Sequence, residues 1–172
     1  MGNRARVGSF ADAAAHGEIL FNCTAGVGSL EALRMAGERT LNGKVLIDIA
    51  NPLDFSKGMP PTLTVCNADS LAEQIQRAFP AVKVVKTLNT VNARLMVNPR
   101  QLADGDHSIF VSGNDASAKI QVTDVLKNWF GWRHVIDLGD ITTARGAEML
   151  LPAWLRLLGA LNTPMFNFKI VR

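Results

Sequence analysis

The sequence has no tyrosine, only two cysteines and only three histidines in 172 residues. Cys23 and Cys66 do not form a CxxC pair, and the histidines are scattered, so the spacing predicts neither a metal site nor a disulfide framework. Because a chain of this length can bury a core without crosslinks, we expect both thiols to be reduced. Reduced thiols are typical of a cytoplasmic protein.

Long apolar runs are also missing. The most apolar stretch, LLPAWLRLLGAL at residues 150–161, is too short to cross a membrane and carries Arg156. The N-terminal sequence MGNRARVGSF lacks the apolar segment of a signal peptide. Lys and Arg exceed Asp and Glu by only three and form no run, so nucleic acid is not an expected partner. A small molecule is the remaining partner class, and a membrane is not expected.

Residue patterns for hydrolysis are absent too. No Ser-His-Asp, Cys-His or paired-carboxylate arrangement stands out in the sequence. The sequence therefore identifies no catalytic side chain, and it favours chemistry supplied by a bound cofactor that the protein orients.

Short aliphatic runs alternate with segments of helical periodicity. Strands are predicted at residues 18–25, 44–51, 81–88, 107–113 and 134–139. Helices are predicted at residues 29–41, with Ser29 as the N-cap, at 70–79, with a capping box of Ser70 and Glu73, and at 93–97 and 118–129. Aliphatic strands that alternate with helices predict an α/β fold, a mostly parallel sheet with helices on both faces.

The pattern changes after residue 140. Residues 142–161 form one helical segment that is apolar around most of its circumference, with a kink expected at Pro152. A helix this apolar must be buried by its own domain or by a second chain. Residues 162–172 fit either a last strand or an extended arm. We therefore divide the chain into residues 1–140 and a C-terminal helix and tail at 141–172.

Polar residues follow two of the predicted strands. The run LIDIANPLDF ends its strand at Asn51 and Pro52, and Asn89 and Thr90 follow the strand KVVKTL. Ligands of parallel sheets bind beyond the carboxyl ends of the strands, so these amides and hydroxyls are candidates to hold a carboxamide or a ring carbonyl. Helix capping by Asn89 or Thr90 is the alternative interpretation.

Four further features have two interpretations each. The Gly26-Val-Gly28 turn lacks the third glycine of a dinucleotide motif, since Glu31 takes its place, so it is either an ordinary turn or a close approach to a ligand. Lys86 is either a rim lysine or a partner for an anion. Thr142 and Thr143 cap a helix or bind an anion there. Glu148 is either a partly buried acid or a residue stabilised by a helix dipole.

Five stretches in this order resemble the NADP-dependent oxidoreductase family typified by NADPH:F420 oxidoreductase. They are ILFNCTAG, KVLIDIANPLDFSKGMPPTL, VVKTLNTVNARLM, FVSGNDASAK and VIDLGDITTARGAEMLLPAWLRLLGAL. More distant resemblance extends to the reductase domain of membrane ferric reductases and to pyrroline-5-carboxylate reductases. The match runs from about residue 10 to the C-terminus.

This resemblance implies a Rossmann-like fold and hydride transfer between NADP(H) and a second ring, the deazaflavin coenzyme F420 or a related acceptor such as a flavin. It places three strand ends at the cofactor: the first beside the dinucleotide, the second near the nicotinamide, and the third where the two rings meet. In chain order, the residues at these strand ends are Thr24, Ala25 and Gly26, then Asn51 and Pro52, then Asn89 and Thr90. It also implies a homodimer that packs through residues 141–172.

Family members open with a strand, a GxGxxG turn, a helix and a second strand, and the sequence shows no counterpart of this unit. Residues 1–140 are therefore expected to form a partial, N-terminally truncated NADP-binding domain with an unpaired strand edge and weak NADP affinity. The alternative hypothesis is a non-catalytic dimeric scaffold that has lost its dinucleotide site.

Overall fold

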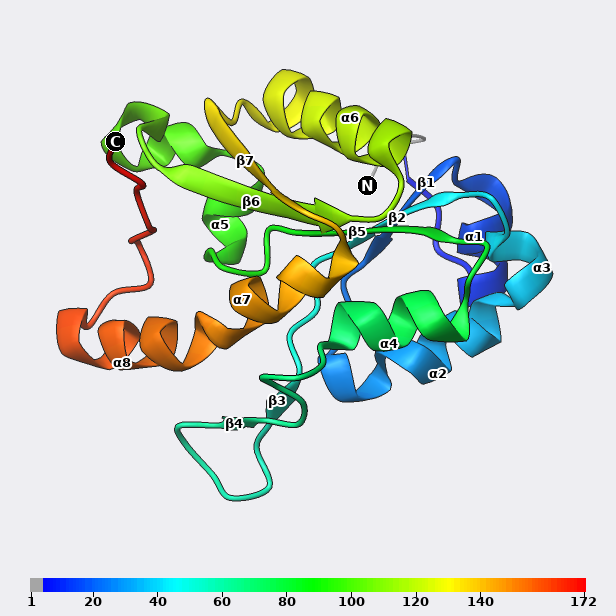
Figure 1. Ribbon diagram of the computed structural model, residues 1–172, viewed down its shortest axis with the longest axis horizontal. Helices are drawn as coiled ribbons and strands as arrows, with labels where there is room; N and C mark the ends of the chain where they lie inside the picture. Colours follow the sequence, from blue (N-terminus) through cyan, green and yellow to red (C-terminus); the bar gives the residue numbers. More distant parts are fainter. Residues whose placement is uncertain (1–4) are drawn as a thin grey trace.

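Five short aliphatic runs form one sheet in the computed structural model, which describes residues 5–172 (Figure 1). Across the sheet the strands lie in the order β1-β2-β5-β6-β7. Their bounds are β1 (Ile19–Asn22), β2 (Val45–Asp48), β5 (Lys83–Thr87), β6 (Ser108–Gly113) and β7 (His134–Gly139). Each strand lies within a run that the sequence predicts as a strand. The predicted Rossmann-like, mostly parallel sheet is confirmed.

The junction between β5 and β6 is antiparallel, whereas β1-β2, β2-β5 and β6-β7 are parallel. A parallel crossover needs a connection that returns across the sheet, usually as a helix. Between β5 and β6 the chain forms only the short α5 (Ala93–Met96) and two 3₁₀ turns (Pro99–Gln101 and Ala103–Gly105). The sequence pattern did not reveal this reversal, because buried parallel and antiparallel strands read alike.

Helices cover both faces of the sheet, and strand side chains alternate between two cores. Leu46 and Val84 pack with helices α2 (Gly26–Ala36) and α4 (Leu71–Ala78) on one face. Ile47 and Val85 pack on the other face with α6 (Ala116–Asp124) and the π-helical turn that continues it (Val125–Phe130). Two further helices, α1 (Phe10–His16) and α3 (Glu38–Leu41), lie beside α2.

The outer edge of β1 has no strand beside it within residues 5–172. β1 pairs with β2 alone, from Ile19 opposite Val45 to Asn22 opposite Asp48. The expected unpaired strand edge is therefore present in the described part of the chain. A hollow of about 330 Å³ runs along this edge between α1 and α2.

Helix α2 begins three residues earlier than predicted. Its N-cap is Ala25, and Ser29 is a buried residue inside the helix. The Ser29 hydroxyl bonds side chains at the end of β1 instead of a backbone N–H group of its own helix. Local capping preference pointed to Ser29, but tertiary polar contacts use it elsewhere.

The C-terminal segment forms two helices in sequence. After a 3₁₀ turn (Ile141–Thr143), α7 (Ala144–Met149) and α8 (Leu151–Leu161) follow one another, with Pro152 in the first turn of α8. The segment is thus interrupted at Leu150, two residues before the position at which a kink was expected. Residues 162–172 form an extended arm, tied to β6 where Ser108 N donates to Phe168 O at 2.9 Å. In the described part of the chain, no helix combines the length and apolar character needed to span a bilayer.

The three tryptophans lie at three depths. Trp132 is 2% exposed and donates its Nε1–H to Met96 O at 2.9 Å. Trp129, at the end of the π-helical turn, is 66% exposed. Trp154 on α8 is half-buried and stacks on Phe166 of the arm, with ring centroids 5.0 Å apart.

Candidate functional site at the ends of three strands

Asn51 and Asn89 join the ends of β2 and β5. Asn51 Nδ2 donates to Asn89 O at 2.8 Å, and Asn89 Nδ2 donates to Asn51 Oδ1 at 3.0 Å. Asn89 Nδ2 also donates to Ala147 O of α7 at 3.1 Å. Within residues 5–172, one N–H of Asn51 and Oδ1 of Asn89 make no hydrogen bond. The pair therefore retains one donor and one acceptor, the two groups that a carboxamide needs.

The start of α2 packs directly against the Asn51-Pro52 backbone. A methyl group added to Gly26 would lie 2.1 Å from Asn51 O and 3.0 Å from Pro52 Cα. Only glycine allows this contact, because a real Cβ never approaches so closely. Ala25, the N-cap residue, makes no side-chain cap, so the helix N-terminus keeps backbone N–H groups and a positive dipole end for a ligand.

Thr24 belongs to a polar network at the end of β1. Its Oγ1 donates to Asn22 Oδ1 at 2.7 Å and lies 2.9 Å from Ser29 Oγ. Asn22 Nδ2 in turn donates to Asp48 Oδ1 at 2.8 Å. This network fixes the turn that leads from β1 into α2.

Thr90 combines burial with an unmet hydrogen bond. Its side chain is buried, and its Oγ1 has no hydrogen-bond partner within residues 5–172. Two residues earlier, Leu88 has a φ of 59°, which is strained for a residue that is not glycine. Unpaired polar atoms and strained backbone cluster at binding sites, so the end of β5 has the local features of such a site.

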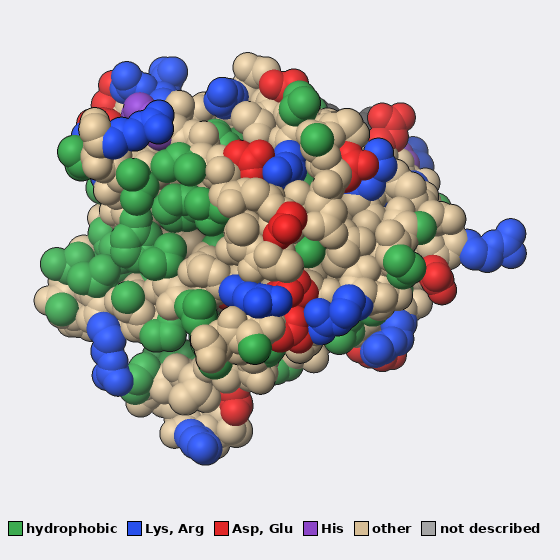
Figure 2. All heavy atoms as spheres, in the orientation of Figure 1, with side chains coloured by type: hydrophobic (Ala, Val, Ile, Leu, Met, Phe, Trp, Pro, Cys, Tyr) green, Lys and Arg blue, Asp and Glu red, His purple; other side chains and the backbone are tan. Residues whose placement is uncertain are grey.

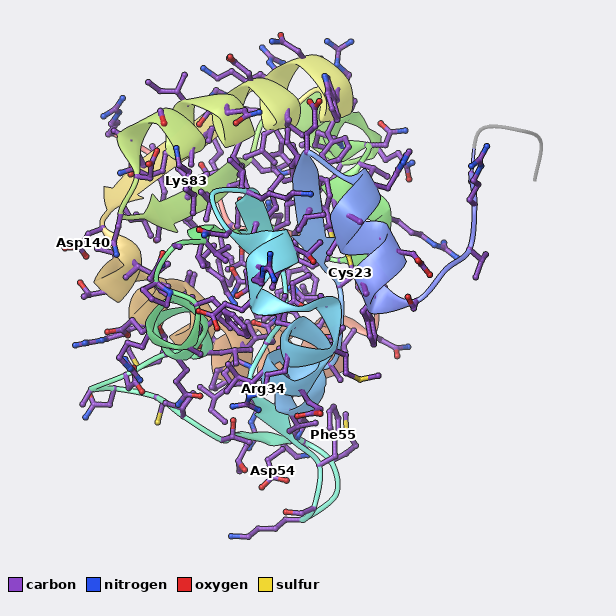
Figure 3. The ribbon with its side chains drawn as sticks, turned by 90° about the vertical axis from the view of Figure 1, so that its right-hand side faces the viewer. Cys23, Arg34, Asp54, Phe55, Lys83 and Asp140 are labelled. Atoms are coloured by element: carbon purple, nitrogen blue, oxygen red, sulfur yellow. The ribbon has the colours of Figure 1, made fainter. Side chains whose placement is uncertain are left out.

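The structure thus places all the predicted cofactor-binding residues at the carboxyl ends of β1, β2 and β5. Gly26 contacts Asn51 and Pro52, and Asn51 bonds Asn89. Thr90 follows Asn89 directly in the sequence, but its hydroxyl forms no hydrogen bond with the other predicted residues. The roles of these residues remain predictions. Figure 3 shows Cys23 at the end of β1, and Asp54 and Phe55 on the hairpin that follows Pro52.

That hairpin consists of β3 (Leu53–Asp54) and β4 (Thr62–Leu63), which pair antiparallel. Its start is anchored to the site, since Thr64 N donates to Pro52 O at 2.8 Å. Cys23 and Cys66 are both free and exposed. Although Cys23 reaches the surface, neighbouring atoms partly desolvate its thiol, and this desolvation, with a smaller effect from the charge of Asp48, raises the pKa of Cys23, so the thiol stays protonated at neutral pH.

A buried ion cluster beneath the site was missed by sequence reasoning. Lys86 Nζ lies 2.9 Å from Asp48 Oδ2 and 3.0 Å from Glu148 Oε1, and it also donates to Ala50 O. The Lys86 side chain is fully buried, so its interpretation as a rim lysine is wrong. Desolvation alone would lower the pKa of Lys86, but the two carboxylates outweigh it and raise that pKa above its ordinary value.

Glu148 caps a helix other than its own. Its Oε2 accepts from Leu71 N at 2.9 Å and its Oε1 accepts from Ala72 N at 3.1 Å, so it fills the N-terminus of α4. Ser70 accepts there from Glu73 N at 3.1 Å. Glu73 completes the predicted capping box only in part, because its carboxylate bonds Ser70 Oγ and Arg145.

The sequence also suggested an anion site at Thr142 and Thr143, but the carboxylate of Asp140 occupies that position. Asp140 Oδ1 accepts from Thr142 N at 3.0 Å and from Thr142 Oγ1 at 2.5 Å. These hydrogen bonds lower the pKa of Asp140, which stays ionised. Thr142 and Thr143 therefore serve a helix start, the first of the two interpretations. Within the described residues no group of His, Cys, Asp and Glu is arranged to hold a metal ion.

The fold and these strand ends define a Rossmann-like protein, and comparisons identify its family. No family model matches the chain. A crystal structure of a candidate F420-dependent NADP reductase from Arthrobacter sp. FB24 is 65% identical, with a TM-score of 0.92, and the match covers 95% of this chain and 74% of that one. Rat metalloreductase STEAP3 is 31% identical over 119 residues, which are 66% of this chain and 22% of STEAP3.

A likeness of fold alone extends to pyrroline carboxylate reductase from Plasmodium falciparum. That structure is 18% identical, has a TM-score of 0.53, and matches 91% of this chain and 53% of its own. At 65% identity over most of both chains, the Arthrobacter protein shows more than fold. The chain belongs to the NADP-dependent oxidoreductase family typified by NADPH:F420 oxidoreductase. The predicted enzyme class, an oxidoreductase, is confirmed.

Proposed function

We propose that this chain binds NADP(H) at the carboxyl ends of β1, β2 and β5 and transfers a hydride between it and a deazaflavin such as F420 or a related acceptor. The observation that carries the proposal is the Asn51–Asn89 pair packed against the start of α2, in a chain 65% identical to a candidate F420-dependent NADP reductase.

The residues present suit this cofactor. The open donor of Asn51 and the open acceptor of Asn89 match the carboxamide of a nicotinamide. The unpaired Thr90 hydroxyl supplies a further polar contact from within the protein. The uncapped start of α2 at Gly26 favours an anionic part of the dinucleotide.

Bound NADPH would supply the hydride, and one proton from solvent completes the two-electron reduction of the acceptor. The protein's part is to hold two rings in contact and to exclude water, because orientation alone lowers such barriers substantially. No acid or base at the strand ends is required for this step. That agrees with a site built of amides, a hydroxyl and backbone.

The test is calorimetric titration of the 172-residue chain with NADPH, followed by NADPH oxidation in the presence of F420 or a flavin. Saturable binding at one site in the micromolar range, about −8 kcal/mol, would support the proposal. Asn89→Ala should weaken binding about tenfold, because it removes a polar partner and breaks the link to Asn51. Asn167→Ala, which changes an asparagine of the C-terminal arm, is the control and should bind normally.

Absence of NADPH binding by the wild-type chain, or binding without turnover with any acceptor, would contradict the proposal. It would favour the alternative of a non-catalytic scaffold. A cytoplasmic location belongs to the same proposal, and two free, exposed thiols support it.

We also propose that residues 141–172 form a dimer interface. Helix α8 carries a single charged residue, Arg156, and several of its apolar side chains, Leu157 and Leu161 among them, remain exposed. Figure 2 shows apolar side chains gathered on the left side of the molecule, where α8 and the arm lie in Figure 1. An exposed apolar surface of this kind is typical of an interface between subunits.

A further inference from the structure

The buried ammonium group of Lys86 forms hydrogen bonds that connect it to all three strand ends of the candidate site. The three acceptors of Lys86 Nζ are Asp48 at the end of β2, Ala50 O immediately before Asn51, and Glu148 on α7. All three side chains of this Asp48–Lys86–Glu148 cluster are at most 2% exposed. An ammonium group has three N–H donors, so each donor of Lys86 has one acceptor.

Two of these acceptors lead to the ends of β1 and β2. Ala50 O precedes Asn51, so the bond from Lys86 fixes the backbone from which Asn51 reaches β5. Asp48 uses its other oxygen to accept from Asn22, whose Oδ1 accepts from Thr24. The turn into α2 is therefore held through a chain of two hydrogen bonds.

The third acceptor leads to the end of β5. Glu148 directly follows Ala147, whose carbonyl oxygen accepts from Asn89 Nδ2 at 3.1 Å. The same carboxylate accepts from the first two N–H groups of α4. The contact between Lys86 and Glu148 thus ties β5 to α7, directly beside the carbonyl oxygen that Asn89 bonds.

We propose that Lys86 is a positioning residue, whose ammonium group fixes the three strand ends relative to one another so that they form one cofactor site. The proposal rests on the proposed function for its effect on turnover, but not for the placement of the strand ends. If Lys86 served only to compensate the two buried carboxylates, neutral side chains at all three positions would leave the strand ends unchanged. Positioning requires a donor directed at three acceptors at once.

The experiment compares two cluster variants, a triple variant and Glu148→Gln, with one control. Lys86→Met alone would leave two unpaired buried carboxylates and lose stability for that reason. The triple variant Lys86→Met/Asp48→Asn/Glu148→Gln removes every charge of the cluster. It therefore tests the placement of the strand ends without leaving an unpaired buried charge that would destabilise the protein. Lys44→Met is the control, because Lys44 also donates to two carbonyl oxygens, Ala14 O and Gly17 O, but at the opposite end of β2.

The first readout needs no cofactor: the NMR signals of the Asn51 and Asn89 side-chain amides. We expect these signals to move or broaden in the triple variant and to stay in place in Lys44→Met. Glu148→Gln is a milder second variant, which should move the Asn89 signal more than the amide signal of Thr24. Unchanged Asn51 and Asn89 signals in both cluster variants would overturn the proposal.

The second readout is steady-state turnover of NADPH. Misplacement by about 1 Å can lower turnover about a hundredfold, so we expect kcat of the triple variant to fall by that order while KM changes less. A folded triple variant with wild-type kcat and unmoved amide signals would show that Lys86 only compensates the two buried carboxylates. If the wild-type chain does not bind NADPH, the proposed function fails, and the amide signals still decide the role of Lys86.

Discussion

At the scale of single residues, two glycines at the start of α2 have opposite surroundings. A Cβ at Gly26 would collide with Asn51 O, whereas a Cβ at Gly28 would meet nothing within 4 Å. Neither residue has a left-handed backbone, so only the contacts differ. The pair therefore separates the effect of close packing at the site from the general effect of glycine in a helix.

We expect Gly26→Ala to lower the free energy of unfolding by about 1–3 kcal/mol, because α2 must move away from Asn51 and Pro52. Gly28→Ala should raise it by about 0.5–1 kcal/mol, since alanine favours the helix. Chemical denaturation of both variants measures the difference. A Gly26→Ala variant as stable as wild type would show that the approach of α2 to Asn51 is not a tight constraint.

Predictions from the sequence were least complete for the contacts of single residues. Asn51 and Asn89 were predicted from polar types at strand ends, and the structure brings them together. The burial of Lys86 in an ion cluster was not predicted, because a lysine in a strand ordinarily lies at the rim, and its partners Asp48 and Glu148 are 38 and 62 positions away in the sequence. Long-range ion pairs leave no local periodicity, so no pattern within a short window could reveal this cluster.

At the scale of secondary-structure elements, helix starts carry the clearest dependence on pH. Asp115 caps α6: its Oδ1 accepts from Ser117 Oγ at 2.5 Å and from Ala118 N at 2.8 Å, and Lys83 lies 3.2 Å from its Oδ2. These contacts, the Ser117 hydroxyl first, lower the pKa of Asp115 from 3.8 to about 2. The folded state therefore prefers the ionised carboxyl group.

Because the folded-state pKa is depressed, the stability that Asp115 contributes is present above 3.8 and is lost as pH falls from 3.8 towards about 2. We expect Asp115→Asn to be less stable than wild type at neutral pH, and to lose less stability across this acid range. Asp124→Asn, at the other end of α6, is the control. Thermal unfolding from neutral pH down to pH 2 measures both, and a wild-type acid profile for Asp115→Asn would contradict the assignment.

Helices and strands were predicted well in type and less well at their ends. The five strands and the capping of α4 by Ser70 follow from aliphatic runs and a local motif. The start of α2 was misplaced because Ser29 serves the end of β1. The direction of β6 was not predictable, because it depends on the path of a long connection and not on the strand's own residues.

At the scale of the whole molecule, the apolar C-terminal segment is the feature that most needs a partner. We expect the wild-type chain to sediment as a dimer, and a variant with Leu157→Glu and Leu161→Glu to sediment as a monomer, because both side chains are exposed on α8. Ile120→Glu, which places one glutamate at an exposed position of α6, is the control. Analytical ultracentrifugation distinguishes these outcomes, and a monomeric wild-type chain at every concentration tested would contradict the proposed interface.

The division of the chain into residues 1–140 and 141–172 remains a prediction. α7 packs against β6, and Glu148 of this helix fills the start of α4. The C-terminal segment is thus attached to the sheet by α7 and again by the arm at β6, while α8 between them reaches beyond the sheet (Figure 1). This arrangement lets one segment serve both the candidate site and the proposed interface.

The placement of the three tryptophans has a spectroscopic consequence. With no tyrosine in the sequence, ultraviolet emission of the native protein comes almost entirely from the indole rings of Trp129, Trp132 and Trp154. Acrylamide would quench Trp129 first and the buried Trp132 last. Trp154, stacked on Phe166, would report on the arm. The chain thus carries unlabelled optical probes of its surface, its core and its C-terminal segment.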